Sequence, residues 1–102
     1  MNNLNQKHEW QWQLFVLILK EAAIIQNISK VEIANKTGYS PSTIGRVFNL
    51  EFCPKLQLFL DISRALQLNI FFETRNSETD LNLAFEKAME SLGRRPDKLP
   101  KN

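Results

Sequence analysis

Few side chains in this 102-residue sequence could carry out covalent chemistry. His8 and Cys53 are the single histidine and the single cysteine, and they stand far apart, so no nucleophile paired with a base is indicated. Cys53 is flanked by an aromatic residue and a proline, which favours a buried, inert thiol. Glu86 and Glu90 are spaced as neighbours on a solvated helix face. We therefore expect no catalytic residue, metal site or cofactor, and no enzyme.

Side chains suited to non-covalent binding of an anionic partner are grouped between residues 29 and 49. Lysine, arginine, hydroxyl and amide groups occur there, and all of them can contact phosphates or the edges of bases. The net charge is only +2, and residues 29–76 hold six basic and four acidic side chains. This charge distribution permits a nucleic-acid partner without indicating one by itself.

The composition is that of a single folded domain. The apolar fraction is 43% and the charged fraction 24%, as in ordinary globular proteins. The longest apolar run, Leu14–Leu19, is too short to span a bilayer, and the first ten residues do not resemble a secretory signal. One cysteine excludes an internal disulfide framework and fits a reducing compartment. We therefore expect a cytoplasmic protein with no membrane partner.

The helical pattern begins at residues 10–25, where apolar side chains recur at helical spacing on two sides. A helix that is apolar on two sides needs two surfaces to pack against. It is therefore either a central core helix, or its second stripe meets another element or another subunit. The first stripe consists of Phe15, Ile18, Leu19, Ala22 and Ile25, and the second of Trp10, Leu14, Leu17 and Ile24.

Two short helices are predicted next, each with a marked start. Ser29 and Glu32 have capping-box spacing, and Ile28 and Ile33 stand where a hydrophobic staple would close over the first turn of a helix at residues 30–36. Gly38 follows as the residue that ends this helix with positive φ. Tyr39 fills the turn after it. A second helix then begins at the Ser-Pro pair 40–41 and runs to Asn49. Its apolar side holds Ile44, Val47 and Phe48, and its small, polar side holds Ser42, Gly45, Arg46 and Asn49.

The remaining chain is predicted to form a helix, a strand and a last helix. The helix over Pro54–Leu66 turns Leu56, Phe59, Ile62 and Leu66 toward the core. Alternation over Asn69–Arg75 predicts a strand, and Ser77–Asp80 is a start signal for a helix over Leu81–Leu92 with Phe85 and Ala88 in its stripe. We expect three regions: a domain at residues 1–76, a helix at residues 77–93 that packs on it or on a dimer partner, and a disordered basic tail at residues 94–102.

The stretch Val31–Asn49 resembles the Cro/C1-type helix-turn-helix proteins, also called the XRE family. Ala34 matches the small residue where the two helices cross, and Gly38 matches the turn glycine. The run that fills the recognition helix is matched by Ser40, Thr43, Ile44, Arg46 and Phe48, and the resemblance extends over about residues 12–68. It implies a mainly α fold, a lambda-repressor-like domain of four to five helices with one short C-terminal strand.

The resemblance further implies a sequence-specific DNA-binding transcriptional regulator, expected to be a repressor, whose recognition helix enters the major groove of palindromic double-stranded DNA. The implied DNA-binding residues are Lys30, Lys36, Ser40, Pro41, Ser42, Thr43, Arg46 and Asn49. Three positions depart from the family pattern. Lys30 replaces a glutamine that often touches a phosphate, Pro41 replaces a base-reading side chain, and Gly45 replaces a serine. A protein-interaction module that has lost DNA binding is therefore an alternative.

A strand after the fourth helix also resembles the HipB-type antitoxins, in which this strand pairs with its copy in a dimer. Because this predicted strand has no second strand in the chain to pair with, and the first helix has a second apolar stripe, we expect a homodimer through Ile70, Phe71 and Phe72. An antitoxin that binds a toxin protein and regulates its own operon is a second alternative. The competing interpretation is an extended connector that packs Phe71 and Phe72 into the core. A monomer capped by its own last helix is the alternative to the dimer.

Overall fold

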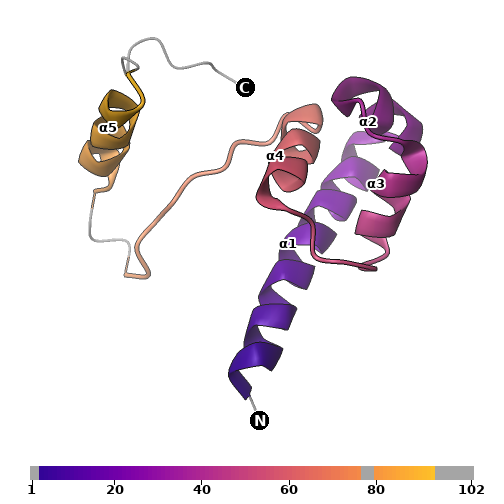
Figure 1. Cartoon of the computed structure of the whole chain (residues 1–102), viewed down its shortest axis with the longest axis horizontal. Helices are drawn as coiled ribbons and strands as arrows, with labels where there is room; N and C mark the ends of the chain where they lie inside the picture. The colour runs from indigo at the N-terminus through magenta and orange to yellow at the C-terminus, as the bar shows by residue number, and fades with distance from the viewer. Residues whose placement is uncertain (1–2, 77–79, 94–102) are drawn as a thin grey trace. The chain divides into compact units, whose positions relative to one another are not determined.

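The structure, a computed structural model, describes residues 3–76 and 80–93, with side chains from Trp10 onward. Within these residues five helices follow one another, and no helix among them is long and apolar enough to cross a membrane. This is the mainly α, helix-turn-helix fold that the sequence predicts. The helices are α1 (Asn3–Gln26), α2 (Lys30–Thr37), α3 (Pro41–Phe48), α4 (Leu56–Ala65) and α5 (Asn82–Ser91) (Figure 1).

The chain divides into two units, Met1–Leu68 and Asn69–Asn102. The first contains α1 to α4, and the second contains α5 and the segment that precedes it. Residues 69–76, which the sequence analysis assigned to the first domain, are grouped here with α5. The predicted tail at residues 94–102 and most of the Ser77–Asp80 start signal lie outside the described residues.

In the first unit, α2 and α3 pack on each other, α3 and α4 pack on α1, and α4 also contacts α2. Figure 1 shows α2, α3 and α4 gathered around the C-terminal half of α1. Burial of apolar side chains where the four helices meet stabilises this unit. The buried apolar residues are Val16, Leu19, Ala23, Ile33, Ala34, Ile44, Val47, Phe48, Ile62, Ala65 and Leu66.

The core face of α1 differs from the prediction. Val16, Leu19 and Ala23 face the core, three positions at helical spacing of which only Leu19 belongs to a predicted stripe. Phe15 is exposed and touches the partly buried Phe59 ring with 6.4 Å between centroids. The opposite side of α1 is apolar and solvent-exposed within its unit: Trp10, Leu14, Leu17, Ile18, Ile24 and Ile25. The prediction was wrong because apolar residues occur around most of this helix, so their spacing does not mark one core face.

The boundaries of α2 are set by side-chain and backbone caps that the sequence predicts. Ser29 Oγ accepts from the Glu32 backbone N–H at 3.1 Å, and Glu32 Oε1 accepts from the Ser29 N–H at 3.2 Å. This is the reciprocal capping box. At the other end, Gly38 has φ of +86° and its N–H donates to the Ala34 carbonyl at 2.8 Å. The helix therefore stops at Thr37, one residue beyond the predicted end.

Tyr39 links the turn after α2 to α4. Its hydroxyl donates a hydrogen bond to Asp61 Oδ2 at 2.8 Å. This bond, together with desolvation and the charge of Asp61, raises the pKa of Tyr39 above its ordinary value of 10.0. Gln57 Nε2 donates to the other oxygen of the same carboxylate at 2.8 Å. The turn is thus fixed to α4 by a side-chain bond across 22 residues.

Two predictions around the start of α4 are wrong. Cys53 is exposed, not buried, and its Sγ lies 3.8 Å from the Pro54 carbonyl oxygen. It stands in the connection between α3 and α4, where Phe52 and not Cys53 packs against the core. Leu56 was expected in the core but is exposed, because it begins the first turn of α4 and the inward face starts at Leu58.

The strand expected over Asn69–Arg75 does not form in the single chain. Residues 69–74 have no regular secondary structure, and no strand occurs in the described part of the chain. A strand requires a neighbouring strand as its hydrogen-bonding partner, and the described residues contain no second strand for this segment to pair with. Phe71 and Phe72, which the alternative interpretation packs into the core, are exposed within their own unit. Pairing with a second copy stays a prediction.

The last helix forms as predicted, at slightly shorter bounds. It begins after Asp80, whose Oδ1 accepts from the Asn82 N–H at 2.8 Å, as in an Asx-turn. It contains no buried residue. Leu83, Phe85 and Leu92 are all exposed. Within its own unit this helix therefore gains little from tertiary packing, which supplies most helical stability in proteins.

Candidate nucleic-acid interface

The pair α2 and α3 is held in a fixed geometry by the turn between them. Gly38 ends α2, and Ser40 begins α3 by accepting from the Thr43 N–H at 3.1 Å. Pro41 occupies the first turn of α3, where a missing N–H leaves no bond unmade. Ala34, buried on α2, is small enough to let the two helices approach closely. Each of these residues was predicted from the sequence.

The outward face of α3 is polar and built from small side chains. Ile44, Val47 and Phe48 are buried, which turns Ser42, Arg46 and Asn49 toward solvent. This is the division of the helix that its sequence predicts. Arg46 is the charged residue of α3, and its side chain is 58% exposed. The face can therefore offer a guanidinium, a hydroxyl and an amide to a surface that approaches it.

Lys30 on α2 lies alongside this face. A Cβ placed on Gly45 would lie 3.6 Å from Lys30 Nζ and 3.7 Å from Lys30 Cδ. The lysine side chain therefore crosses α3 at its glycine, and the ammonium group joins the polar face. Within this unit the group that lies over Gly45 is the side chain of Lys30.

Ser40 and Thr43 stand at the N-terminal end of the same face. Their hydroxyl oxygens are 3.0 Å apart and share a hydrogen bond. The Ser40 hydroxyl also caps α3, and one of the two hydroxyl groups donates its proton to the other oxygen. Their remaining hydrogen-bonding capacity is available to a ligand that approaches the N-terminal end of α3 beside Pro41.

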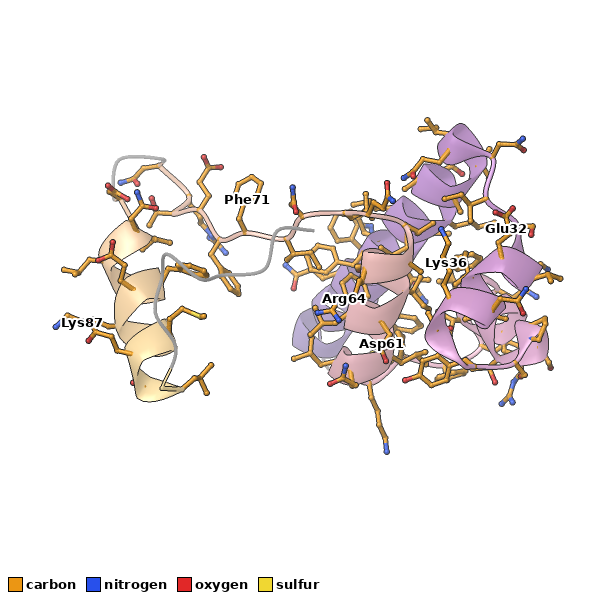
Figure 2. All side chains as sticks on the ribbon, turned by 90° about the horizontal axis from the view of Figure 1, so that it is seen from above. Glu32, Lys36, Asp61, Arg64, Phe71 and Lys87 are labelled. Carbon is orange, nitrogen blue, oxygen red and sulfur yellow. The ribbon has the colours of Figure 1, made fainter. Side chains whose placement is uncertain are left out.

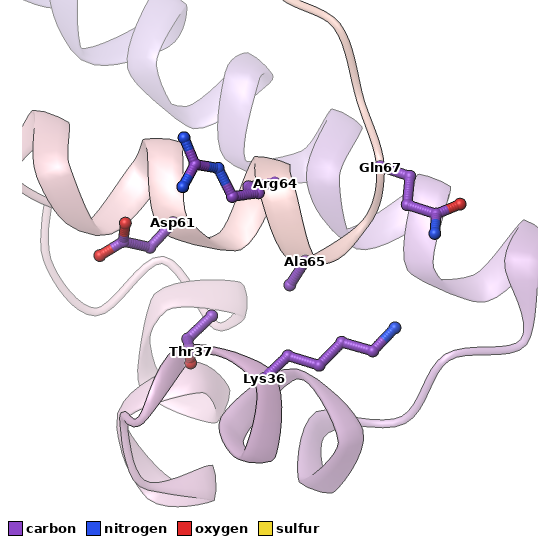
Figure 3. Close-up of a pocket in the computed structure, with 6 residues that line it drawn as sticks. All are labelled: Lys36, Thr37, Asp61, Arg64, Ala65 and Gln67. Carbon is purple, nitrogen blue, oxygen red and sulfur yellow. The ribbon is translucent and has the colours of Figure 1, made fainter. Parts of the chain in front are cut away.

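Lys36 is placed elsewhere. It lines a pocket of about 430 Å³ between the C-terminal parts of α2 and α4, together with Thr37, Asp61, Arg64, Ala65 and Gln67. Figure 3 shows Lys36 and Thr37 on the α2 side of this pocket and Asp61, Arg64 and Ala65 on the α4 side. Of the eight predicted residues, the structure thus gathers seven on or beside α3 and puts Lys36 in a different environment.

Sequence reasoning missed two residues of the site, Glu51 and Phe52. Glu51 Oε1 lies 3.7 Å from Arg46 Nε, and the Phe52 ring centroid lies 5.5 Å from Arg46 Cζ. Both residues follow α3 in the connection to α4. They follow Arg46 by five and six residues, and residues at this distance lie beside Arg46 only if the chain reverses direction at the end of α3. A sign of that reversal in the sequence could have identified them.

The described residues contain no cluster of three or more histidine, cysteine or carboxylate side chains that could hold a metal ion. A short helix, a tight glycine turn and a second helix with an exposed polar face form a helix-turn-helix motif. In such motifs the second helix lies in the major groove of DNA. The fold and the site therefore define a DNA-binding protein.

The comparison with protein families agrees. The helix-turn-helix family model matches residues 19–72, which is more than half of the chain. The chain belongs to the Cro/C1-type helix-turn-helix family, the XRE family of DNA-binding transcription regulators, as its sequence indicated. This family is not known for enzymatic activity. No curated protein and no solved structure matches the chain.

Proposed function

We propose that this protein is a sequence-specific repressor that inserts α3 into the major groove of double-stranded DNA in the cytoplasm and has no enzymatic activity or cofactor. The observation that carries the proposal is the outward face of α3, where Ser42, Arg46 and Asn49 are exposed side by side with the ammonium of Lys30.

The roles within the face follow from the chemistry of each group. Arg46 has the donors for a two-bond contact with the O6 and N7 atoms of guanine, a contact worth ~1–3 kcal/mol of discrimination. Asn49 and Ser42 can bond base edges or the backbone. Lys30 and Ser40 are suited to phosphates, which position the protein without reading the sequence. Pro41 and Thr43 form the first turn of α3, where they would lie against the DNA backbone. Lys36 lines the pocket with α4 and is the least favoured of the eight residues for a DNA contact.

Selection of bound sequences from random DNA tests the proposal, with affinities measured at two salt concentrations. Arg46→Ala should lower the preference for one base pair. Lys30→Ala should weaken specific and non-specific DNA alike and lower the salt slope by about one. Lys87→Ala, which removes an exposed charge on α5, is the matched control (Figure 2). An Arg46→Ala protein with unchanged affinity and base preference would contradict the assignment.

The proposal includes a homodimer on a palindromic site. Ile70, Phe71 and Phe72 are 51%, 79% and 87% exposed. Together with Leu81 and Phe85 they line an apolar groove of about 810 Å³ in the second unit, with Phe71 projecting from the extended segment (Figure 2). Pairing of residues 69–75 with their two-fold copy would supply the missing neighbouring strand and cover these side chains. Two recognition helices about 34–36 Å apart would then read both half-sites.

Sedimentation at micromolar concentration tests the dimer. The wild type should sediment above its 11.9 kDa monomer mass. Phe72→Asp should dissociate it and weaken binding to the full site, because a charge would be buried in the interface. Phe72→Leu, which keeps an apolar side chain, should stay dimeric. A monomer at all concentrations, or selected DNA with a single half-site, would rule out this part of the proposal.

An antitoxin is the second candidate, favoured by the same apolar groove, which a toxin protein could fill in place of a second copy. The two functions differ in their partners. Co-expression with the product of an adjacent gene should yield a stable complex only for an antitoxin. A third outcome, a chain that selects no DNA but binds a protein, would identify an interaction module.

A further inference from the structure

The end of α3 holds the chain in a conformation that brings Glu51 back to Arg46. The N–H of Glu51 donates to the Arg46 carbonyl at 3.0 Å, and the N–H of Leu50 donates to the Val47 carbonyl at 2.9 Å. Leu50 has φ of +61°. These two bonds and the left-handed residue form a Schellman motif. The position of Glu51 relative to the last turn of α3 is therefore fixed by the backbone.

Phe52 is fixed by a different means. It is partly buried and packs against the core of the first unit. Its ring lies 5.5 Å below the guanidinium carbon of Arg46, within the range of a cation–π contact. The carboxylate of Glu51 lies on the Nε side of the same guanidinium, at 3.7 Å. Within the described residues, Glu51 is the carboxylate found within 4.0 Å of Arg46.

An arginine on an exposed helix face otherwise has many rotamers, and DNA binding must select one of them. Here the Glu51 carboxylate lies 3.7 Å from Nε and the Phe52 ring centroid lies 5.5 Å from Cζ, and both contacts favour the same placement of the guanidinium. The two terminal amino groups, which donate in a two-bond contact with guanine, are left for DNA. The connection after α3 thus holds the guanidinium before DNA arrives.

We propose that Glu51 and Phe52 are positioning residues that hold the Arg46 guanidinium ready to read a base, which makes them determinants of sequence specificity. This inference rests on the proposed DNA-binding function. Ordering one long side chain on binding lowers affinity by roughly two- to tenfold. Loss of either positioning contact should therefore reduce the discrimination that Arg46 provides by a factor of that order.

The negative charge of Glu51 gives the proposal a distinctive signature. A carboxylate near the DNA surface repels phosphates, so its removal should leave non-specific affinity unchanged or raise it. A positioning role predicts that specificity falls at the same time. These opposite changes separate positioning from general damage to the interface, which would lower both affinities together.

The experiment compares Glu51→Gln and Phe52→Leu with the wild type on the selected site and on variants of that site changed at one base pair each. Discrimination should fall about two- to tenfold at the base pair read by Arg46 and at no other. Glu90→Gln, which removes an exposed carboxylate on α5, is the matched control and should leave every ratio unchanged. Thermal melting of each variant shows whether the first unit is intact. If Phe52→Leu has a lowered melting temperature, Glu51→Gln alone tests the proposal, because the Glu51 side chain is 51% exposed and its replacement should not destabilise the core.

A double-mutant cycle makes the test specific. In an Arg46→Ala background, Glu51→Gln should cause no further loss of discrimination, because no guanidinium is left to position. The proposal is overturned if Glu51→Gln has no effect on discrimination, changes it equally at all base pairs, or still lowers it without Arg46. A wild-type protein that selects no DNA would overturn the proposed function itself, a result distinct from all of these.

Discussion

Replacement of Gly38 measures how much the turn of the helix-turn-helix depends on one backbone conformation. Gly38 has φ of +86°, and a Cβ built at this position meets nothing within 4 Å. The cost of a side chain here is therefore not a collision with neighbours but the strain of its own backbone. For an L-residue the left-handed conformation costs roughly 1–2 kcal/mol.

The magnitude should depend on the type of side chain in a defined order. Gly38→Ala also reduces the freedom of the unfolded chain, which offsets ~0.4–1 kcal/mol of the strain. The net loss is then about 0.5–1 kcal/mol. Gly38→Asn should cost less, because asparagine tolerates positive φ. Gly38→Val should cost about 2 kcal/mol, because a β-branched side chain is strained there.

Thermal and urea melting of the three variants are the assays. A loss of 1 kcal/mol should lower the melting temperature by about 4–8 °C for a domain of this size. Base preference should not change in the fraction that remains folded, because the exposed side chains of α3 are untouched. A Gly38→Val protein with wild-type melting, or equal losses for asparagine and valine, would show that positive φ is not what the turn requires.

Three other predictions use the same melting measurements. Ser29→Ala should cost ~1 kcal/mol by removing the capping hydrogen bond to Glu32, and an unchanged melting temperature would contradict it. Gln67→Gly should stabilise the protein by ~0.5–1 kcal/mol, since exposed Gln67 has φ of +60° after α4 and glycine relieves that strain; destabilisation would argue against strain there. The hydrogen bond to Asp61 raises the pKa of Tyr39 in the folded protein. The stability that this bond contributes is therefore complete below the pKa of 10.0 in the unfolded chain, and it is lost as pH rises through the raised pKa of the folded state. The stability difference between wild type and Tyr39→Phe should therefore shrink above pH 10, and a constant difference would refute this.

The parts of the site predicted from sequence are those whose physical cause lies within a few residues. A capping box needs only Ser29 and Glu32, three positions apart, and the turn needs only a glycine at position 38. The inward face of α3 is marked by three large apolar residues on an otherwise small, polar helix. These local causes, which were predicted, also fix the relation of α2 to α3, so the motif could be identified without knowledge of the rest of the fold.

Other features depend on contacts that local sequence does not mark. The core face of α1 is chosen by where α3 and α4 pack, since apolar residues occur on most sides of that helix. The extended segment at residues 69–74 has strand-forming residues, but strand formation depends on a partner and not on those residues alone.

The contacts of Arg46 are the clearest case. They depend on a chain reversal at Leu50, where no glycine signals positive φ, and on a ring at position 52 that is held by the core. The left-handed conformation of Leu50 carries a local cost, which the two backbone hydrogen bonds and the packing of the partly buried Leu50 against the core offset. Because Leu50 stands where a C-terminal cap usually has glycine, the path of residues 50–52 depends on tertiary packing of Leu50 and Phe52 as well as on these hydrogen bonds. The orientation of the one charged side chain on the recognition helix therefore depends on the stability of the core, although the side chain itself is exposed.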